Sequence, residues 1–198
     1  MKEFKEAANP CFYVVGISHK KADAQLRGKF SLDNESKTKL LQRAKSVGID
    51  SLVATSTCNR TEIYGFVRHP LELEKLLCDI TKGSINEFQS VSYVYKSSDA
   101  IHHMFRVGAG LDSQILGDFE IISQLKLSAK ISKKHGVLNA FVERLINAVI
   151  QASKRIKTET KLSSGATSVS FASVQYIKKT IQDISSKNIL LFGTGKIG

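Results

Sequence analysis

The chain has 198 residues, of which 42% are hydrophobic, and a formal net charge of +11. It is long enough for one well-cored domain and part of a second, and its composition excludes a disordered chain. Its three cysteines, Cys11, Cys58 and Cys78, are odd in number and widely spaced, so we expect no disulfide framework and no metal site, in a reducing, cytoplasmic setting. The N-terminal segment lacks the apolar core of a signal peptide, and no apolar run is long enough to cross a bilayer, so no membrane association is expected.

The first 96 residues predict the element order β-α-β-β-α-β. Short apolar runs bounded by turn residues predict the strands, and apolar residues at helical spacing predict the helices. The strands are expected at 12–17, 51–55, 62–67 and 92–95, and the helices at 36–47 and 70–80. This order is typical of a ferredoxin-like sandwich, so we predict an α/β (α+β) fold whose antiparallel sheet, within about 11–96, is covered on one face by the two helices.

Helices are expected to follow the sheet. The apolar spacing predicts a helix after Ser98, a break from Gly108 to Gly117, and two further helical stretches, the longer one from 138 to 156. Ser163 to Gly165 is the clearest linker. We therefore predict a first domain at 1–162, with its helical part at about 98–162, and the start of a second domain at 163–198.

The last segment predicts a helix at 168–181 and a strand at 188–192 that leads directly into a glycine-rich turn. Gly193, Gly195 and Gly198 have the spacing of a Rossmann dinucleotide-binding fingerprint, in which the glycines permit a tight turn and close approach to a pyrophosphate. The chain stops at Gly198, so we expect a truncated Rossmann domain with an incomplete cofactor site. An ordinary glycine-rich surface turn is the alternative.

More than half of the excess positive charge lies between Glu120 and Leu162. This stretch has nine basic residues against three acidic ones: Lys126, Lys130, Lys133, Lys134, Arg144, Lys154, Arg155, Lys157 and Lys161 against Glu120, Glu143 and Glu159. Clustered cations on helices attract phosphates through counterion release, which favours RNA or another polyanion as a partner. A solvated helix face explains the same charge run equally well.

Cys58 is the candidate nucleophile, because it lies between two predicted strands and beside a cation, Arg60. A neighbouring guanidinium lowers the pKa of a thiol and so favours the nucleophilic thiolate. A small buried core residue is the common alternative for a free cysteine, and we assign Cys11 and Cys78 to that role. His102 and His103 share a predicted helix, and either could assist a thiol as acid or base, although packing at a helix surface is the commoner case.

These residues resemble the glutamyl-tRNA reductase family over nearly the whole chain. The resemblance rests on these blocks, in order: Gly16 to Lys20 with Arg27; Ser56 to Tyr64; Gly110 to Gly117 with Glu120 and Gln124; Lys154 to Thr160; Ser168 to Ser170; and the final glycine-rich turn. It implies that Cys58 attacks the ester of glutamyl-tRNA(Glu) and forms a thioester, which NADPH reduces to glutamate-1-semialdehyde at the start of tetrapyrrole (porphyrin) biosynthesis.

The resemblance also implies roles for individual residues. Cys58 and His103 match the catalytic positions, and the substrate-binding positions are Thr57, Asn59, Arg60, Ser113, Asp118, Phe119, Glu120 and Gln124. The cofactor-binding turn is Gly193, Thr194, Gly195, Lys196, Ile197 and Gly198. The forked guanidinium of Arg60 suits a glutamate carboxylate.

The sequence departs from the family pattern at Asp118, where glutamate is usual, and at Ser123, where glycine is usual. Family members continue through a whole NADPH domain and a helical dimerisation domain, so we expect this piece to lack reductase activity and to dimerise only with that C-terminal region. The family's product also implies contact with the aminomutase that acts next. Alternatives are a glutamyl-tRNA esterase, an aminoacyl-tRNA binding module with a structural Cys58 and, last, a generic NAD-dependent dehydrogenase.

Overall fold

The computed structural model describes residues 9–160, 162, 169–190 and 192. Its strands are β1 (Cys11–Ser18), β2 (Leu52–Ser56), β3 (Arg60–Val67) and β4 (Tyr93–Lys96). Its helices are α1 (Ala24–Lys29), α2 (Asn34–Ser46), α3 (Pro70–Ile80), α4 (Ile85–Val91), α5 (Ser98–Gly108), α6 (Glu120–Lys134), α7 (Ala140–Glu159) and α8 (Val169–Thr180), with a 3-10 turn, η2, at Ile184–Ser186. The mixed α/β class is confirmed, and the four strands and two helices predicted before residue 97 are all present.

The four strands form one antiparallel sheet in the order β2-β3-β1-β4. In the centre of the sheet, Val14 of β1 lies opposite Tyr64 of β3 and Tyr95 of β4. The short connection between β2 and β3 makes these two strands a hairpin, with Ser56 opposite Thr61. This hairpin ends in the Cys58 segment, so the sheet register fixes where that segment lies.

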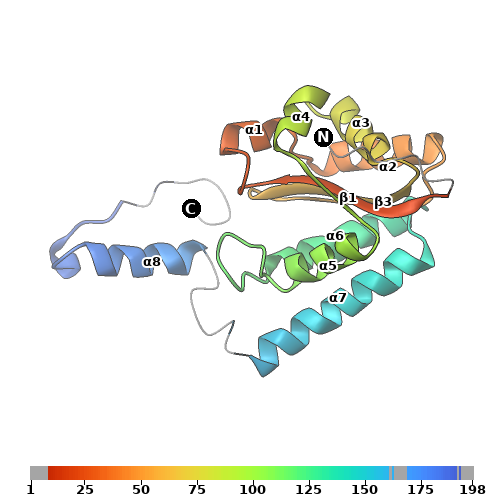
Figure 1. Cartoon of the computed structure of the whole chain (residues 1–198). Helices are drawn as coiled ribbons and strands as arrows, with labels where there is room; N and C mark the ends of the chain where they lie inside the picture. The colour runs from red at the N-terminus through yellow and green to blue at the C-terminus, as the bar shows by residue number, and fades with distance from the viewer. Residues whose placement is uncertain (1–8, 161, 163–168, 191, 193–198) are drawn as a thin grey trace.

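Helices cover both faces of the sheet (Figure 1). Side chains alternate along β1, so Tyr13, Val15 and Ile17 pack with α2, α3 and α4, whereas Phe12 and Val14 pack with α5, α6 and α7. The two helices predicted before residue 97, α2 and α3, cover one face as expected, and helices that follow the sheet cover the other. The second face is apolar, so it needs its own helices to exclude water.

Two short helices, α1 and α4, were absent from the sequence prediction, although each has a recognisable start. Asp23 accepts a hydrogen bond from the Leu26 N–H at the start of α1 (2.7 Å). Ser84 and Glu87 form a reciprocal capping box at the start of α4. Each helix has seven residues or fewer, which is too short to display a clear apolar period.

In the C-terminal segment, α8 agrees with the predicted helix at 168–181. Residues 188–190 and 192, in contrast, do not form the predicted strand. A strand needs a neighbouring strand to accept and donate its backbone hydrogen bonds, and none lies beside these residues in the part of the chain that is described. The glycine-rich turn at 193–198 lies outside the described residues. No helix among those described combines the length and the apolar character needed to span a membrane.

Candidate active site

Cys58 lies at the tip of the hairpin between β2 and β3, where its side chain is exposed. The Thr57 N–H donates to the Arg60 carbonyl (2.8 Å), which closes a tight turn around Cys58 and Asn59. The Thr57 hydroxyl oxygen then accepts from the N–H groups of Asn59 (3.2 Å) and Arg60 (3.3 Å). The threonine therefore organises the backbone of the tip, and the thiol points away from the core.

Two neighbouring groups hold the backbone of this tip in place. The Arg27 Nε–H donates to the Cys58 carbonyl (3.0 Å), and the His19 N–H donates to the Asn59 carbonyl (2.9 Å). Arg27 also donates from Nη1 to the Ala22 carbonyl (2.6 Å), which ties the hairpin to the segment after β1. The carbonyls of the tip are thereby satisfied by the protein, so the Cys58 side chain is presented on a fixed backbone.

The loop between α5 and α6 faces the hairpin and depends on two glycines with positive φ. Gly110 (φ 70°) and Gly117 (φ 81°) adopt the left-handed conformation that glycine tolerates best, and the Gly117 N–H donates to the Gly110 carbonyl (3.0 Å). A Cβ on Gly117 would lie 2.5 Å from the Leu162 carbonyl oxygen. The folded loop brings Ser113 and Asp118 opposite Cys58.

Hairpin, loop and the first turns of α6 together enclose a cavity of about 260 Å³. Eight of the predicted site residues line it: Thr57, Cys58, Asn59, Arg60, Ser113, Asp118, Glu120 and Gln124. Ser56 and Ile121 complete the lining. Hydroxyl, amide, carboxylate, guanidinium and thiol groups therefore converge on one small cavity.

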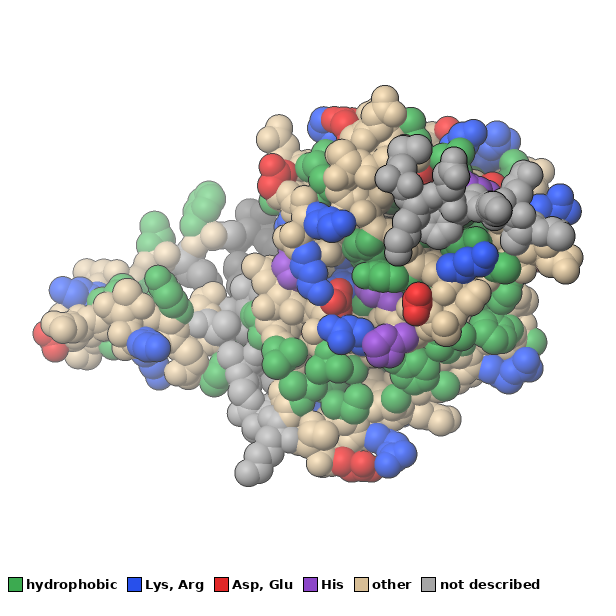
Figure 2. Space-filling model, viewed as in Figure 1, with side chains coloured by type: hydrophobic (Ala, Val, Ile, Leu, Met, Phe, Trp, Pro, Cys, Tyr) green, Lys and Arg blue, Asp and Glu red, His purple; other side chains and the backbone are tan. Residues whose placement is uncertain are grey.

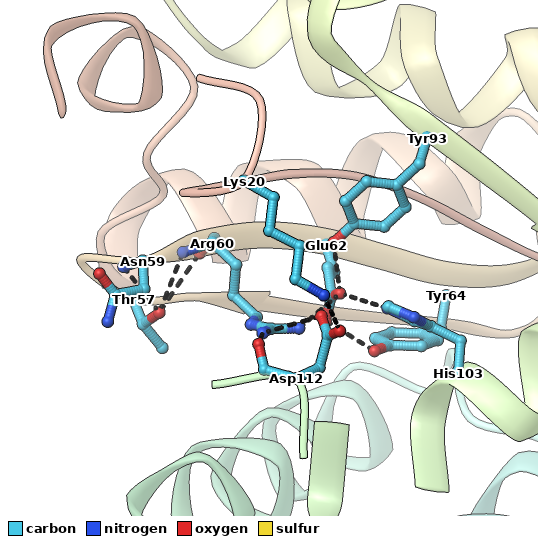
Figure 3. Close-up of polar contacts among 9 residues, drawn as sticks. All are labelled: Lys20, Thr57, Asn59, Arg60, Glu62, Tyr64, Tyr93, His103 and Asp112. Atoms are coloured by element: carbon cyan, nitrogen blue, oxygen red, sulfur yellow. Dashed lines mark hydrogen bonds and ion pairs between the residues drawn. The ribbon is translucent and has the colours of Figure 1, made fainter. Parts of the chain in front are cut away.

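Arg60 is 3% exposed, and its guanidinium is held by two acidic residues (Figure 3). Nη1 donates to Glu62 Oε1 (3.1 Å), and Nη2 donates to the Asp112 carboxylate (3.2 Å) and to its backbone carbonyl. Asp112 also pairs with Lys20. Burial would raise the pKa of Asp112, but the hydrogen bond from Lys20 and the charge of Arg60 outweigh it and lower that pKa. The sequence suggested that Arg60 is a free cation beside the thiol. In the structure its guanidinium is instead part of a buried charge network.

Glu62 is the centre of this network and is fully buried. Besides Arg60, it accepts hydrogen bonds from Tyr64 Oη (2.7 Å), Tyr93 Oη (2.5 Å) and His103 Nε2 (2.6 Å). Burial by itself would raise the pKa of Glu62, but the charge of Arg60 and the hydrogen bonds from His103 and Tyr93 lower it to about 2. Burial raises the pKa of Tyr64 and that of Tyr93 well above the ordinary value of a tyrosine. Both hydroxyls therefore stay neutral and donate to the charged Glu62 carboxylate.

His103 is buried and lies outside the cavity lining. Its ring stacks on Tyr95, with a centroid distance of 4.8 Å, and lies tilted against Tyr93 at 5.3 Å. An ionised carboxylate only accepts, so His103 Nε2 carries a hydrogen toward Glu62, which leaves the lone pair on Nδ1 in the neutral ring. The structure thus connects His103 to Arg60 through Glu62 and does not place it against Cys58.

Phe119 is the N-cap of α6 and, like His103, is a predicted catalytic or substrate-binding residue that does not line this cavity. Its ring lies 5.8 Å from Lys157 Nζ. A larger groove of about 470 Å³ runs between α6 and α7, and its lining of apolar side chains and lysines includes none of the predicted site residues. The smaller cavity is the candidate site, because the thiol and the convergent polar groups line it. The described residues contain no cluster of His, Cys, Asp and Glu that could hold a metal ion.

The basic stretch on α6 and α7 is partly neutralised. Lys133 pairs with Glu143 (2.5 Å), and Arg155 pairs with Glu159 (3.1 Å). On the face seen in Figure 2, Lys and Arg side chains are scattered among apolar and acidic ones. The charge excess is compatible with a polyanionic partner but does not outline a single track for it on that face.

Sequence reasoning gave no role to Lys20, Glu62, Tyr93 or Asp112. Glu62 and Asp112 lie inside the motifs that carry the family resemblance, and an acidic residue within a strand is itself an unusual signal, because burying a carboxylate requires several partners. Tyr93 carried no comparable signal. Only the folded chain reveals its contact with Glu62.

Comparisons with known proteins place the chain in one family. The family model described as "Glutamyl-tRNAGlu reductase, N-terminal domain" matches residues 15–160. Glutamyl-tRNA reductase 2 of Flavobacterium johnsoniae is 65% identical over the whole chain, which covers 46% of that protein, and glutamyl-tRNA reductase of Microcystis aeruginosa is 34% identical over 93% of the chain and 44% of its own length. The solved glutamyl-tRNA reductase of Methanopyrus kandleri superposes with a TM-score of 0.67 at 27% identity, over 85% of this chain and 39% of that one.

The fold and the site thus define an α/β domain that carries an exposed thiol beside a cavity lined by polar groups. The chain belongs to the glutamyl-tRNA reductase family. It spans a little under half the length of the curated relatives it matches.

Proposed function

We propose that this chain is the substrate-binding part of a glutamyl-tRNA reductase and that Cys58 is its nucleophile. The observation that carries the proposal is the exposed Cys58 thiol on a fixed hairpin tip, at the edge of a polar cavity of about 260 Å³. The thiolate attacks the ester carbonyl carbon of glutamyl-tRNA(Glu). The Cys58 thiol releases its proton to solvent, a C–S bond forms, the C–O bond to the terminal ribose breaks, and the ribose oxygen takes up a proton from solvent, which leaves a glutamyl thioester on the enzyme.

In this proposal the cavity residues orient the glutamyl group. Arg60 pairs with its free side-chain carboxylate, while Thr57, Asn59, Ser113 and Gln124 offer hydrogen bonds to its polar atoms. Asp118, Phe119 and Glu120 stay proposed contacts at the start of α6. His103 is proposed to support catalysis by holding Glu62, and through it Arg60, in place, because its Nε2 contacts Glu62 (2.6 Å).

The finer assignments for the whole protein are proposals as well. NADPH would supply the hydride that reduces the thioester to the aldehyde of glutamate-1-semialdehyde. We propose that residues 163–198 are the beginning of a Rossmann domain and that the turn at 193–198 contributes to binding NADPH. For the first domain, 1–162, we propose a ferredoxin-like core on the basis of the strand order β2-β3-β1-β4. We also propose that the complete enzyme is cytoplasmic and dimerises through a C-terminal region. It would contact the next enzyme of the route, an aminomutase.

The test is to mix the chain with glutamyl-tRNA, quench in acid and search for a glutamyl group on the Cys58 peptide by mass spectrometry. We expect an adduct on Cys58 that is absent from Cys58→Ser and retained in Cys78→Ser, whose thiol packs against the core. Failure of the wild-type chain to form the adduct while it binds intact, charged tRNA in a salt-sensitive manner would contradict the nucleophile and leave a tRNA-binding module.

A further inference from the structure

Asp112 accepts the hydrogen bonds of Arg60 that a substrate carboxylate would need. Arg60 contributes to the cavity wall, yet its Nη2 already donates to the Asp112 carboxylate (3.2 Å) and backbone carbonyl. Nη1 donates to Glu62 (3.1 Å). Both arms of the guanidinium fork therefore have acidic partners from the protein itself, and Figure 3 shows the three side chains in contact. Both hydrogens of Nη2 are directed to Asp112, so a ligand carboxylate that takes a two-pronged contact including Nη2 has to replace Asp112 there.

The two acidic partners differ in how firmly they are held. Glu62 is completely buried inside the fold and satisfies three other donors, so its removal would leave buried polar groups unpaired. The Asp112 side chain is 8% exposed and belongs to the loop between α5 and α6. It also contacts Lys20, whose side chain is 52% exposed. Asp112 is therefore the partner that can leave Arg60 and still keep a cation.

We infer that the side-chain carboxylate of the substrate displaces the Asp112 side chain from Arg60, and that Lys20 retains Asp112 when this happens. The inference rests on the proposed function, in which a glutamyl group enters this cavity. The exchange leaves every carboxylate with a cation: before it, Arg60 and Lys20 face Glu62 and Asp112, and after it, Arg60 faces Glu62 and the ligand while Lys20 faces Asp112. No buried charge is left alone, which is the arrangement that would be most costly.

If this displacement occurs, Asp112 competes with a ligand carboxylate for Arg60, and Lys20 favours the ligand by pairing with the displaced Asp112. The probe is L-isoglutamine, which has the free side-chain carboxylate of a glutamyl group and an amide in place of its ester. Binding is measured in the 198-residue chain as protection of Cys58 from iodoacetamide, followed by mass spectrometry of the Cys58 peptide. The α-amide of L-glutamine, which has no carboxylate, is the matched neutral probe.

We expect Asp112→Asn to lower the half-protecting isoglutamine concentration by about two- to fivefold and Lys20→Met to raise it by a similar factor, which is the range that one partly exposed ion pair supports. Lys21→Met removes a neighbouring exposed lysine and is expected to match the wild type. The neutral probe should not distinguish the variants.

A higher or unchanged half-protecting concentration in Asp112→Asn would overturn the inference, because Asp112 would then hold Arg60 in place for the ligand. Equal alkylation rates with and without isoglutamine in the wild type and in Lys20→Met would overturn it too. The result is independent of the thioester assay. Protection with the expected order of variants but no glutamyl adduct on Cys58 would refute the proposed nucleophile and leave the carboxylate exchange standing.

Discussion

Replacing Glu62 by glutamine tests the buried charge network beneath the candidate site. Glu62 accepts from the Arg60 guanidinium (3.1 Å), from Tyr64 and Tyr93 (2.7 and 2.5 Å) and from His103 (2.6 Å). Glutamine keeps the size of the side chain but removes its charge and exchanges one accepting oxygen for a donating nitrogen. Arg60, at 3% exposure, would then be a buried cation with Asp112 as its remaining acidic partner.

The size of the effect follows from the pKa of Glu62. That pKa is lowered from 4.5 to about 2, and at about 1.4 kcal/mol per pH unit this corresponds to about 3 kcal/mol of stability. Removing one partner of a buried ion pair costs a similar amount, about 3–5 kcal/mol. Because the pKa is lower in the folded protein than in the unfolded chain, this stability is fully present above pH 4.5 and is lost as the pH falls toward about 2.

Urea unfolding followed by circular dichroism measures the loss, with Glu143→Gln as control, because Glu143 pairs with Lys133 on the surface. We expect Glu62→Gln to lower the free energy of unfolding by about 3 kcal/mol at pH 7 and the control to lower it by less than about 1 kcal/mol. The gap between wild type and Glu62→Gln should narrow at pH 3. A loss no larger than the control, or a gap that does not narrow, would refute an ionised, stabilising Glu62.

The same unfolding assay tests two local features of the chain. Gly16→Ala should cost about 1–3 kcal/mol, because a Cβ there would lie 2.8 Å from Glu62 Cγ, whereas Gly28→Ala in α1 has no atom within 4 Å and should cost nothing or stabilise by up to about 1 kcal/mol. An equal effect of both substitutions would contradict this. Ser84→Ala should cost about 1 kcal/mol through loss of the capping box with Glu87, and an unchanged midpoint would mean that α4 is held by packing alone.

Local patterns were sufficient for most of the fold. Short apolar runs located β1 and β3 to within two residues, and Pro70 marked the first residue of α3. The covered second face was missed because it depends on where α5 and α7 pack after the chain turns back, which no local period encodes. The strand predicted at 188–192 shows the same limit, since a strand forms only beside a partner.

The site divides in a similar way. The hairpin tip around Cys58 is a local structure, and Thr57 to Arg60 carry its turn signals. The contacts that balance the charge of Arg60 are distant in sequence. Asp112 lies 52 residues from Arg60, and His103 lies 41 residues from its partner Glu62. Spacing in the sequence cannot predict such pairs. The sequence therefore suggested that Arg60 is a cation available to the thiol, whereas in the fold its charge is balanced by Glu62 and Asp112.

Burial decreases step by step along this network, and that gradient separates stability from binding. Side-chain exposure rises from 0% at Glu62 to 3% at Arg60, 8% at Asp112 and 52% at Lys20. An ion pair is hardest to exchange where water cannot replace the lost partner and easiest where it can. Substitution of Glu62 should therefore change the unfolding free energy by several kcal/mol. Substitution of Lys20 should leave folding almost unchanged and alter only the competition for Arg60, so the two ends of one network are expected to give separable measurements.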